Sequence, residues 1–161
     1  MDEKILNWVN LAEKFSASGD PKSMRTVARE IFELDKNSAD GLAIMAESSL
    51  YLGNVDEAES LSEYALSVEP NHLRGRLIAG GVAVKKFRLR EQMEIFDALI
   101  KDAHAELKTL HGKLNDFNRK FALKRREKTS EDEDAQKKLQ KKIFITQSIL
   151  FKALCWSSNG F

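Results

Sequence analysis

Residues 53–72 read GNVDEAESLSEYALSVEPNH, which predicts one helix with a turn on either side. Asn54 and Glu57 form a capping pair that opens the helix, and Pro70 ends it because proline cannot continue a helix. Asn71 follows and is predicted to cap the next helix. Between these ends three apolar residues recur at helical spacing: Leu61, Ala65 and Val68. The stretch therefore predicts a helix that packs one face against a neighbour.

The same order of features recurs when the chain is divided into windows of 34 residues, 5–38, 39–72 and 73–106. The first window contributes Trp8, Leu11, Ala12, Phe15 and Gly19, and the second contributes Leu42, Met45, Ala46, Gly53, Ala58, Ala65 and Pro70. The third keeps Ala79, Gly80, Phe96 and Leu99, with Arg76 in place of a large apolar residue. Asp20 before Pro21 marks another capped helix start. The windows predict six helices in three antiparallel pairs.

This pattern resembles that of the tetratricopeptide repeat (TPR) family. Its unit has a large apolar residue, Leu-Gly and an aromatic residue in a first helix, then a glycine turn, then a second helix with small alanines that ends near a proline. The resemblance covers residues 5–106. It implies an all-α fold in which TPR-like helix pairs stack as an α-solenoid, with the first helix of each pair lining a concave face.

Beyond the third window a heptad pattern replaces the 34-residue period. Apolar residues alternate in steps of three and four: Met93, Phe96, Ile100, Ala103, Leu107, Leu110, Leu114, Phe117 and Phe121. The helix is expected to continue toward Arg126, turn near residues 128–130 and restart at a capping box formed by Ser130 and Glu133. The returning helix carries Leu139, Ile143, Thr146, Leu150 and Ala153. Residues 107–157 therefore predict a protruding, coiled-coil-like antiparallel hairpin.

Folding the hairpin back gives a specific register. The pairs expected to lie close together are Leu139 with Phe117, Ile143 with Leu114, and Leu150 with Leu107. After the hairpin, Trp156 to Gly160 have the spacing of the opening of another repeat, with Asn159 in the leucine position. A further repeat is therefore predicted to begin at residues 153–161. The segment 1–161 is expected to form a single all-α domain at the front of a longer protein.

The sequence offers little catalytic chemistry. It contains no Walker-type glycine loop, no His-Glu-x-x-His, no Cys-x-x-Cys and no nucleophile elbow. His104 and His111 share a helix face, but a zinc site needs three or four protein ligands and no suitable partner is spaced near them. Cys155 next to Trp156 is expected to be a small buried hydrophobic residue. We therefore expect a protein that is not an enzyme and holds no cofactor or metal.

Composition favours a cytoplasmic protein. The formal net charge is +1, which supplies no strong field for nucleic acid or an acidic membrane. The basic stretch 113–128 includes Phe117 and Phe121, but both belong to the heptad pattern, so a nucleic-acid partner is not expected. The start of the chain has no secretory signal, and the most apolar stretch, 143–156, is too short to span a membrane and contains Lys152.

The TPR resemblance also implies which residues face the groove. By position these are Val9, Asn10 and Glu13, then Ala43, Ile44, Glu47 and Tyr51, then Arg74, Leu77, Ile78 and Lys85. We expect the protein-binding side chains among them to be Asn10, Glu13, Glu47, Tyr51, Arg74 and Lys85. Some TPR co-chaperones clamp a C-terminal carboxylate with lysine, asparagine and arginine, but here Val9, Glu13 and Ile78 stand at such positions. A peptide with one basic and one acidic patch would complement this groove better.

The function expected from these features is that of a protein- or peptide-binding scaffold. Two alternatives remain open. The hairpin or the C-terminal edge could pair with a second copy, giving a self-association module. The chain could also be the N-terminal recognition or oligomerisation module of a larger enzyme, since some bacterial protein glycosyltransferases resemble this plan in carrying TPR repeats ahead of the catalytic domain.

Overall fold

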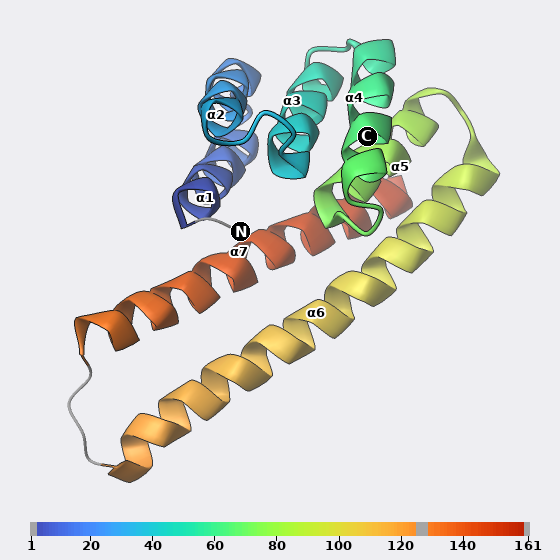
Figure 1. The fold of residues 1–161 in the computed structure, drawn as a ribbon. Coiled ribbons are helices and arrows are strands. Elements are labelled where there is room, and N and C mark those ends of the chain that lie inside the picture. The colour runs from blue at the N-terminus through green and yellow to red at the C-terminus, as the bar shows by residue number, and fades with distance from the viewer. Residues whose placement is uncertain (1–2, 125–128, 160–161) are drawn as a thin grey trace.

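The fold is all-α, as expected. A computed structural model describes residues 3–124 and 129–159, and every regular element within these ranges is a helix. The helices are α1 Glu3–Ser18, α2 Pro21–Leu34, α3 Ala39–Tyr51, α4 Val55–Val68, α5 Leu73–Lys85, α6 Leu89–Lys124 and α7 Ser130–Asn159. In Figure 1, α1 to α5 and the start of α6 form a stack, and α6 and α7 extend from it as two long antiparallel helices.

Corresponding helices of the stack begin 34 residues apart. Helices α3 and α5 begin at Ala39 and Leu73, and α2, α4 and α6 begin at Pro21, Val55 and Leu89. The turn inside each helix pair repeats at the same interval through a left-handed residue: Gly19 at φ 69°, Gly53 at φ 80° and Phe87 at φ 56°. The six helices predicted for residues 5–106 are therefore present, and the sixth continues far beyond the window.

Two predicted helix starts are confirmed. The side chain of Asp20 accepts a hydrogen bond of 3.1 Å from the Ser23 amide at the start of α2. Asn54 precedes α4, and its side-chain nitrogen lies 3.5 Å from a Glu57 carboxylate oxygen, although the Asn54 side chain caps no backbone amide. Helix α4 therefore begins where the sequence indicates, with a weaker cap than expected.

Two other caps differ from the prediction by one residue. Helix α5 is capped by His72 and not by Asn71, because the His72 Nδ1 accepts a hydrogen bond from a backbone amide in the first turn. Helix α7 is preceded by Thr129, which forms a reciprocal capping pair with Asp132 in place of the pair expected at Ser130. In each case a neighbouring side chain of similar hydrogen-bonding capacity takes the cap position.

Glycines in the middle of α5 allow close helix packing. A Cβ atom added to Gly80 would lie 2.7 Å from the Phe96 ring of α6, and one added to Gly81 would lie 2.9 Å from the Trp156 ring of α7. No side chain fits at either position without displacing a neighbour. The interpretation of this glycine pair as a packing feature is therefore confirmed.

The heptad pattern predicts the pairing of α6 with α7 well. Leu107, Leu110 and Ile143 form a buried cluster, and Leu114, Leu139 and Leu150 pack against it. Farther along the hairpin, the Gln136 side chain donates a 3.0 Å hydrogen bond to Asn118. Met93 is an exception, because 65% of its surface is exposed. The turn expected near residues 128–130 falls largely outside the described residues.

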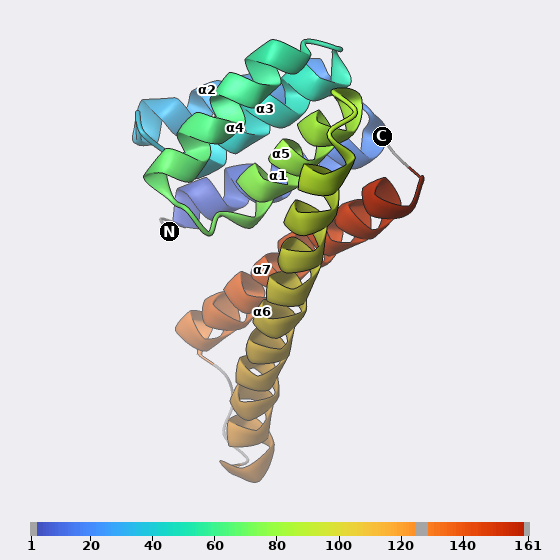
Figure 2. The same ribbon diagram turned by 90° about the vertical axis from the view of Figure 1, so that its right-hand side faces the viewer.

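The course of α7 differs from the prediction. Only one end of the α6–α7 pair protrudes, because the C-terminal part of α7 lies along the stack and contacts α1 and α5 (Figures 1 and 2). Helix α7 is continuous from Ser130 to Asn159, so no new helix begins between residue 153 and the end of the described chain. Trp156, predicted to open a further repeat, is buried in the main hydrophobic core instead.

Candidate functional site

The inner face of the stack is the side of α1, α3 and α5 that is turned toward α7. Helices α1 and α5 contact α7 directly, whereas α2 and α4 lie on the far side of the stack (Figure 2). Apolar contacts hold the C-terminal end of α7, where Ile149, Ala153 and Trp156 join a core cluster with residues of α3, α4, α5 and α6. The inner face therefore has a helix of the same chain packed on it.

Four charged side chains meet between the inner face and α7, and we call them the buried ion cluster: Glu13, Glu47, Arg74 and Lys152. The Arg74 guanidinium donates to both carboxylates, at 2.5 Å to Glu47 and at a short distance to Glu13. The Lys152 ammonium lies 2.6 Å from a Glu47 oxygen and 3.1 Å from a Glu13 oxygen. Two cations thus neutralise two carboxylates contributed by different helices.

Hydroxyl groups complete the hydrogen bonding of this cluster. Ser148 of α7 donates to Glu13 at 2.5 Å, and Ser16 of α1 donates to Glu47 at 2.7 Å. The Ser16 hydroxyl also lies 3.3 Å from that of Tyr51. Because buried charges are costly unless they are paired and hydrogen-bonded, these contacts make burial of the four charges tolerable.

The electrostatics of the cluster favour its charged state. Burial alone would raise the pKa of Glu47, but the charges of Lys152 and Arg74 outweigh it and lower that pKa to about 2. Burial would lower the pKa of Lys152, but Glu47 and Glu13 outweigh it and raise that pKa above its ordinary value. Burial and the Glu47 carboxylate raise the pKa of Tyr51. Glu47 and Lys152 therefore remain charged near neutral pH.

Three of the six predicted binding residues are not exposed as expected. Glu13 and Glu47 are completely buried and Arg74 is almost so, because α7 covers them and supplies Lys152 as their partner. The apolar groove positions are buried as well: Val9, Ala43, Ile44, Leu77 and Ile78. The expected pattern of acidic and basic patches open to a peptide is therefore wrong at these residues.

The other predicted residues lie at the margins of the inner face. Asn10 and Tyr51 are half-buried, and Lys85 is exposed at the end of α5. The sequence reasoning missed Lys152 as a functional partner of the glutamates. Its signal was present, since Lys152 is the one charged residue in the apolar stretch from 145 to 156. A lone lysine on a buried helix requires a buried acidic partner.

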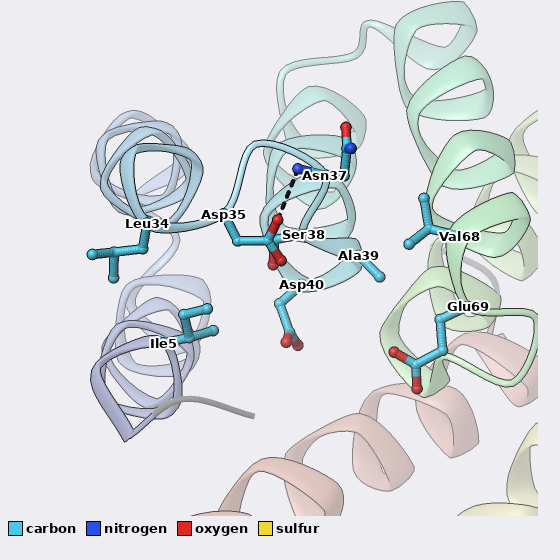
Figure 3. Close-up of a pocket in the computed structure, with 9 residues that line it drawn as sticks. All are labelled: Ile5, Leu34, Asp35, Asn37, Ser38, Ala39, Asp40, Val68 and Glu69. Atoms are coloured by element: carbon cyan, nitrogen blue, oxygen red, sulfur yellow. Dashed lines mark hydrogen bonds between the residues drawn. The ribbon is translucent and has the colours of Figure 1, made fainter.

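Helix α7 leaves one part of the inner side open, beside the loops between helix pairs. The largest cavity there, of about 650 Å³, lies between the start of α1, the α2–α3 loop and the end of α4 (Figure 3). Two smaller cavities, of about 150 and 120 Å³, continue toward α7 and α6. Asp40 lines all three, so we treat them as one furrow.

The furrow is acidic and partly apolar. The carboxylates of Asp35, Asp40 and Glu69 line the largest cavity, and Figure 3 shows Asp40 between Ile5 on one side and Glu69 on the other. Asp35 accepts a 3.1 Å hydrogen bond from the Asn37 amide, and Asp40 lies 3.1 Å from the His72 Nε2. Ile5, Leu34 and Val68 provide apolar walls. Such a lining suits a ligand that carries both positive charge and aliphatic groups.

Comparison with models of known protein families gives no match for this chain, and comparison with curated proteins gives none either. No helix in the described ranges is long and apolar enough to cross a bilayer. Within the same residues, no three His, Cys, Asp or Glu side chains are grouped so that they could hold a metal ion. The site must therefore be interpreted from its own residues.

Proposed function

We propose that this chain is a protein-binding scaffold made of three TPR-like helix pairs, and that it binds a protein or peptide on the inner side of the stack. The 34-residue interval between corresponding helices and between left-handed turn residues supports the repeat assignment. Stacks of such units bind partners through the face lined by the first helix of each pair. The proposal assigns no catalytic role to the chain.

One observation carries the proposal: the inner face accommodates a long amphipathic helix. Helix α7 lies against α1 and α5 and inserts the apolar Trp156 beside Gly81 and the charged Lys152 between two glutamates. Apolar anchors combined with a few placed polar contacts are how a helix is recognised in a groove. The inner side of this stack therefore has the chemistry of a recognition surface.

Because α7 covers the middle of the inner face, a partner must use what remains accessible. The furrow and the loops around it remain open, and Asn37 is exposed at its edge. The opposite side of the stack is formed by α2 and α4, and α4 carries exposed residues such as Glu63. A probe at position 37 therefore reports binding at the inner side, and a probe at position 63 reports binding elsewhere on the stack.

Site-specific photo-crosslinking tests the proposal. A photoreactive amino acid replaces Asn37 in one version of the full chain and Glu63 in another, and adducts formed in cell extract are identified by mass spectrometry. We expect a discrete partner to attach through position 37 and not through position 63, and the purified partner to bind the wild-type chain in solution. Equal labelling from both positions, or no adduct from position 37, would contradict the proposal.

A further inference from the structure

The furrow beside α7 has features that the scaffold role alone does not require. Its three cavities extend from the α2–α3 loop to the α6–α7 pair, and neighbouring cavities share lining residues. The largest cavity lies in the size range of ligand sites, roughly 300–1,000 Å³. The furrow is therefore large enough for a short extended segment of another chain.

Negative charge dominates the furrow. Four carboxylates line it: Asp35, Asp40, Glu69 and Glu106. Asp40 has the His72 imidazole as its partner, whereas Asp35, Glu69 and Glu106 form no ion pair with any described residue. Of the cations that line the furrow, the Arg74 guanidinium is already bound to Glu13 and Glu47, so Lys142 is the cation that remains to balance the furrow's carboxylates. The furrow's own residues therefore carry too little positive charge to neutralise its carboxylates.

A separate observation, made on α7, also indicates a ligand. Thr146 is only 3% exposed and lines both smaller cavities, yet its hydroxyl forms no hydrogen bond with any residue in the described part of the chain. Among the described residues, the fully buried side-chain polar atom without a partner is Arg25 Nε, so the Thr146 hydroxyl is not sealed in the interior but opens onto a cavity. A peptide group in the furrow can reach this hydroxyl and form a hydrogen bond with it.

The placement of the carboxylates favours a peptide over a single ion. They are distributed along the furrow, and no three acidic or histidine side chains of the described residues are grouped closely enough to share a metal ion. A phosphate-bearing ligand would be repelled by the same charges. Lysine and arginine side chains match the furrow better, because their aliphatic stems pack on residues such as Leu34 and Val68 while their charged ends reach the carboxylates.

From these observations we infer that the furrow binds a lysine- or arginine-bearing segment of a partner protein, with its cations on Glu69 and Glu106 and a backbone group on Thr146. This inference rests on the proposed scaffold function and names the chemistry of its partner. It places the recognition beside α7, at residues that the TPR resemblance did not indicate.

An unbiased peptide selection tests the inference. A phage-displayed dodecapeptide library is selected on the full chain, and one enriched peptide is synthesised as a labelled probe for titration by fluorescence anisotropy. We expect enriched sequences to contain lysine or arginine. The furrow variant Glu69→Gln with Glu106→Gln should weaken probe binding about tenfold, since each lost charge-assisted hydrogen bond contributes to affinity. Thr146→Val should weaken it several-fold.

The matched control carries the same change of charge elsewhere. Glu30→Gln with Glu33→Gln alters two exposed acidic residues of α2 and should leave the dissociation constant within about twofold. Enriched peptides without cations, or equal weakening in the furrow variant and in this control, would overturn the inference while leaving the scaffold function intact. If no peptide is enriched and position 37 captures no partner, both the inference and the proposed function are wrong.

Discussion

Replacing Lys152 with methionine tests how α7 is held on the inner face. Methionine keeps most of the length and apolar volume of the lysine stem but removes its charge. In the wild type the Lys152 ammonium contacts Glu47 at 2.6 Å and Glu13 at 3.1 Å, and its side chain is 12% exposed. The variant leaves two buried carboxylates with Arg74 as their only cation, so the cluster carries an uncompensated negative charge.

The expected loss of stability follows from that charge. Removing one partner of a buried ion pair costs about 3–5 kcal/mol, because the other partner remains buried without compensation. The cost should shrink on acidification. Without Lys152 the pKa of Glu47 rises from about 2, so this carboxyl is protonated at a higher pH in the variant and then needs no cation. The difference in stability between the two proteins should therefore be largest near neutral pH and should become smaller at pH values below about 4.5.

Urea unfolding followed by circular dichroism measures this difference. Lys137→Met is the matched control, because Lys137 lies on the same helix, is well exposed and faces Asp134 across 3.8 Å. Exposed pairs of this kind contribute about 0–1 kcal/mol, so the control should unfold nearly as the wild type does. If Lys152→Met destabilises the protein no more than Lys137→Met does, the buried ion cluster does not hold α7 as argued.

Three further predictions concern other parts of the molecule. Folding lowers the pKa of Glu47 to about 2, so its ionised form stabilises the folded state by about 3 kcal/mol above the ordinary glutamate pKa, and this contribution is lost as the pH falls toward 2. In urea titrations, the stability of the wild type should therefore decline more steeply over that pH interval than the stability of Glu47→Gln does. Gly81→Ala should lower the stability measured by thermal unfolding by about 1–3 kcal/mol, because the new Cβ would lie 2.8 Å from Leu50. Gly112→Ala, whose Cβ would have no neighbour within 4 Å, should instead stabilise the protein by about 1 kcal/mol. Equal effects of the two substitutions would refute the packing argument. Phe87 is 87% exposed at φ 56°, so Phe87→Gly should raise stability by about 1 kcal/mol, and a loss would mean that its ring makes contacts that matter.

Local signals in the sequence were sufficient for most of the fold. Helix spacing, the cap at Asp20, the helix start after Asn54, and the glycine pair at 80 and 81 each depend on residues close in the chain or on one packing rule. The structure agrees with each of them. The pairing of α6 with α7 was predictable because a heptad pattern specifies which side chains meet. The predicted heptad pattern began one position too early, at the exposed Met93, since the spacing of apolar residues alone does not show where the partner helix ends.

The site could not be predicted from the same signals. Charged residues usually lie at the surface, so Glu13, Glu47 and Arg74 were expected to be exposed, and only the position of Lys152 more than 75 residues later in the chain explains their burial. The furrow likewise collects residues from loops and helices that are far apart in sequence. Thr146 was predicted as one of the heptad positions that face the partner helix. That pattern gave no sign that its hydroxyl lines a cavity and has no hydrogen-bond partner among the described residues.

Observation of the Lys152 ammonium group by nitrogen-15 NMR is the most direct test of whether α7 closes the inner face. Lysine ammonium hydrogens exchange with water too fast to give sharp signals when exposed, whereas an ammonium enclosed between two carboxylates exchanges slowly. The account predicts a persistent lysine Nζ signal near neutral pH that is absent in Lys152→Arg and shifted in Glu47→Gln. Rapid exchange of every lysine ammonium in the folded protein would contradict it.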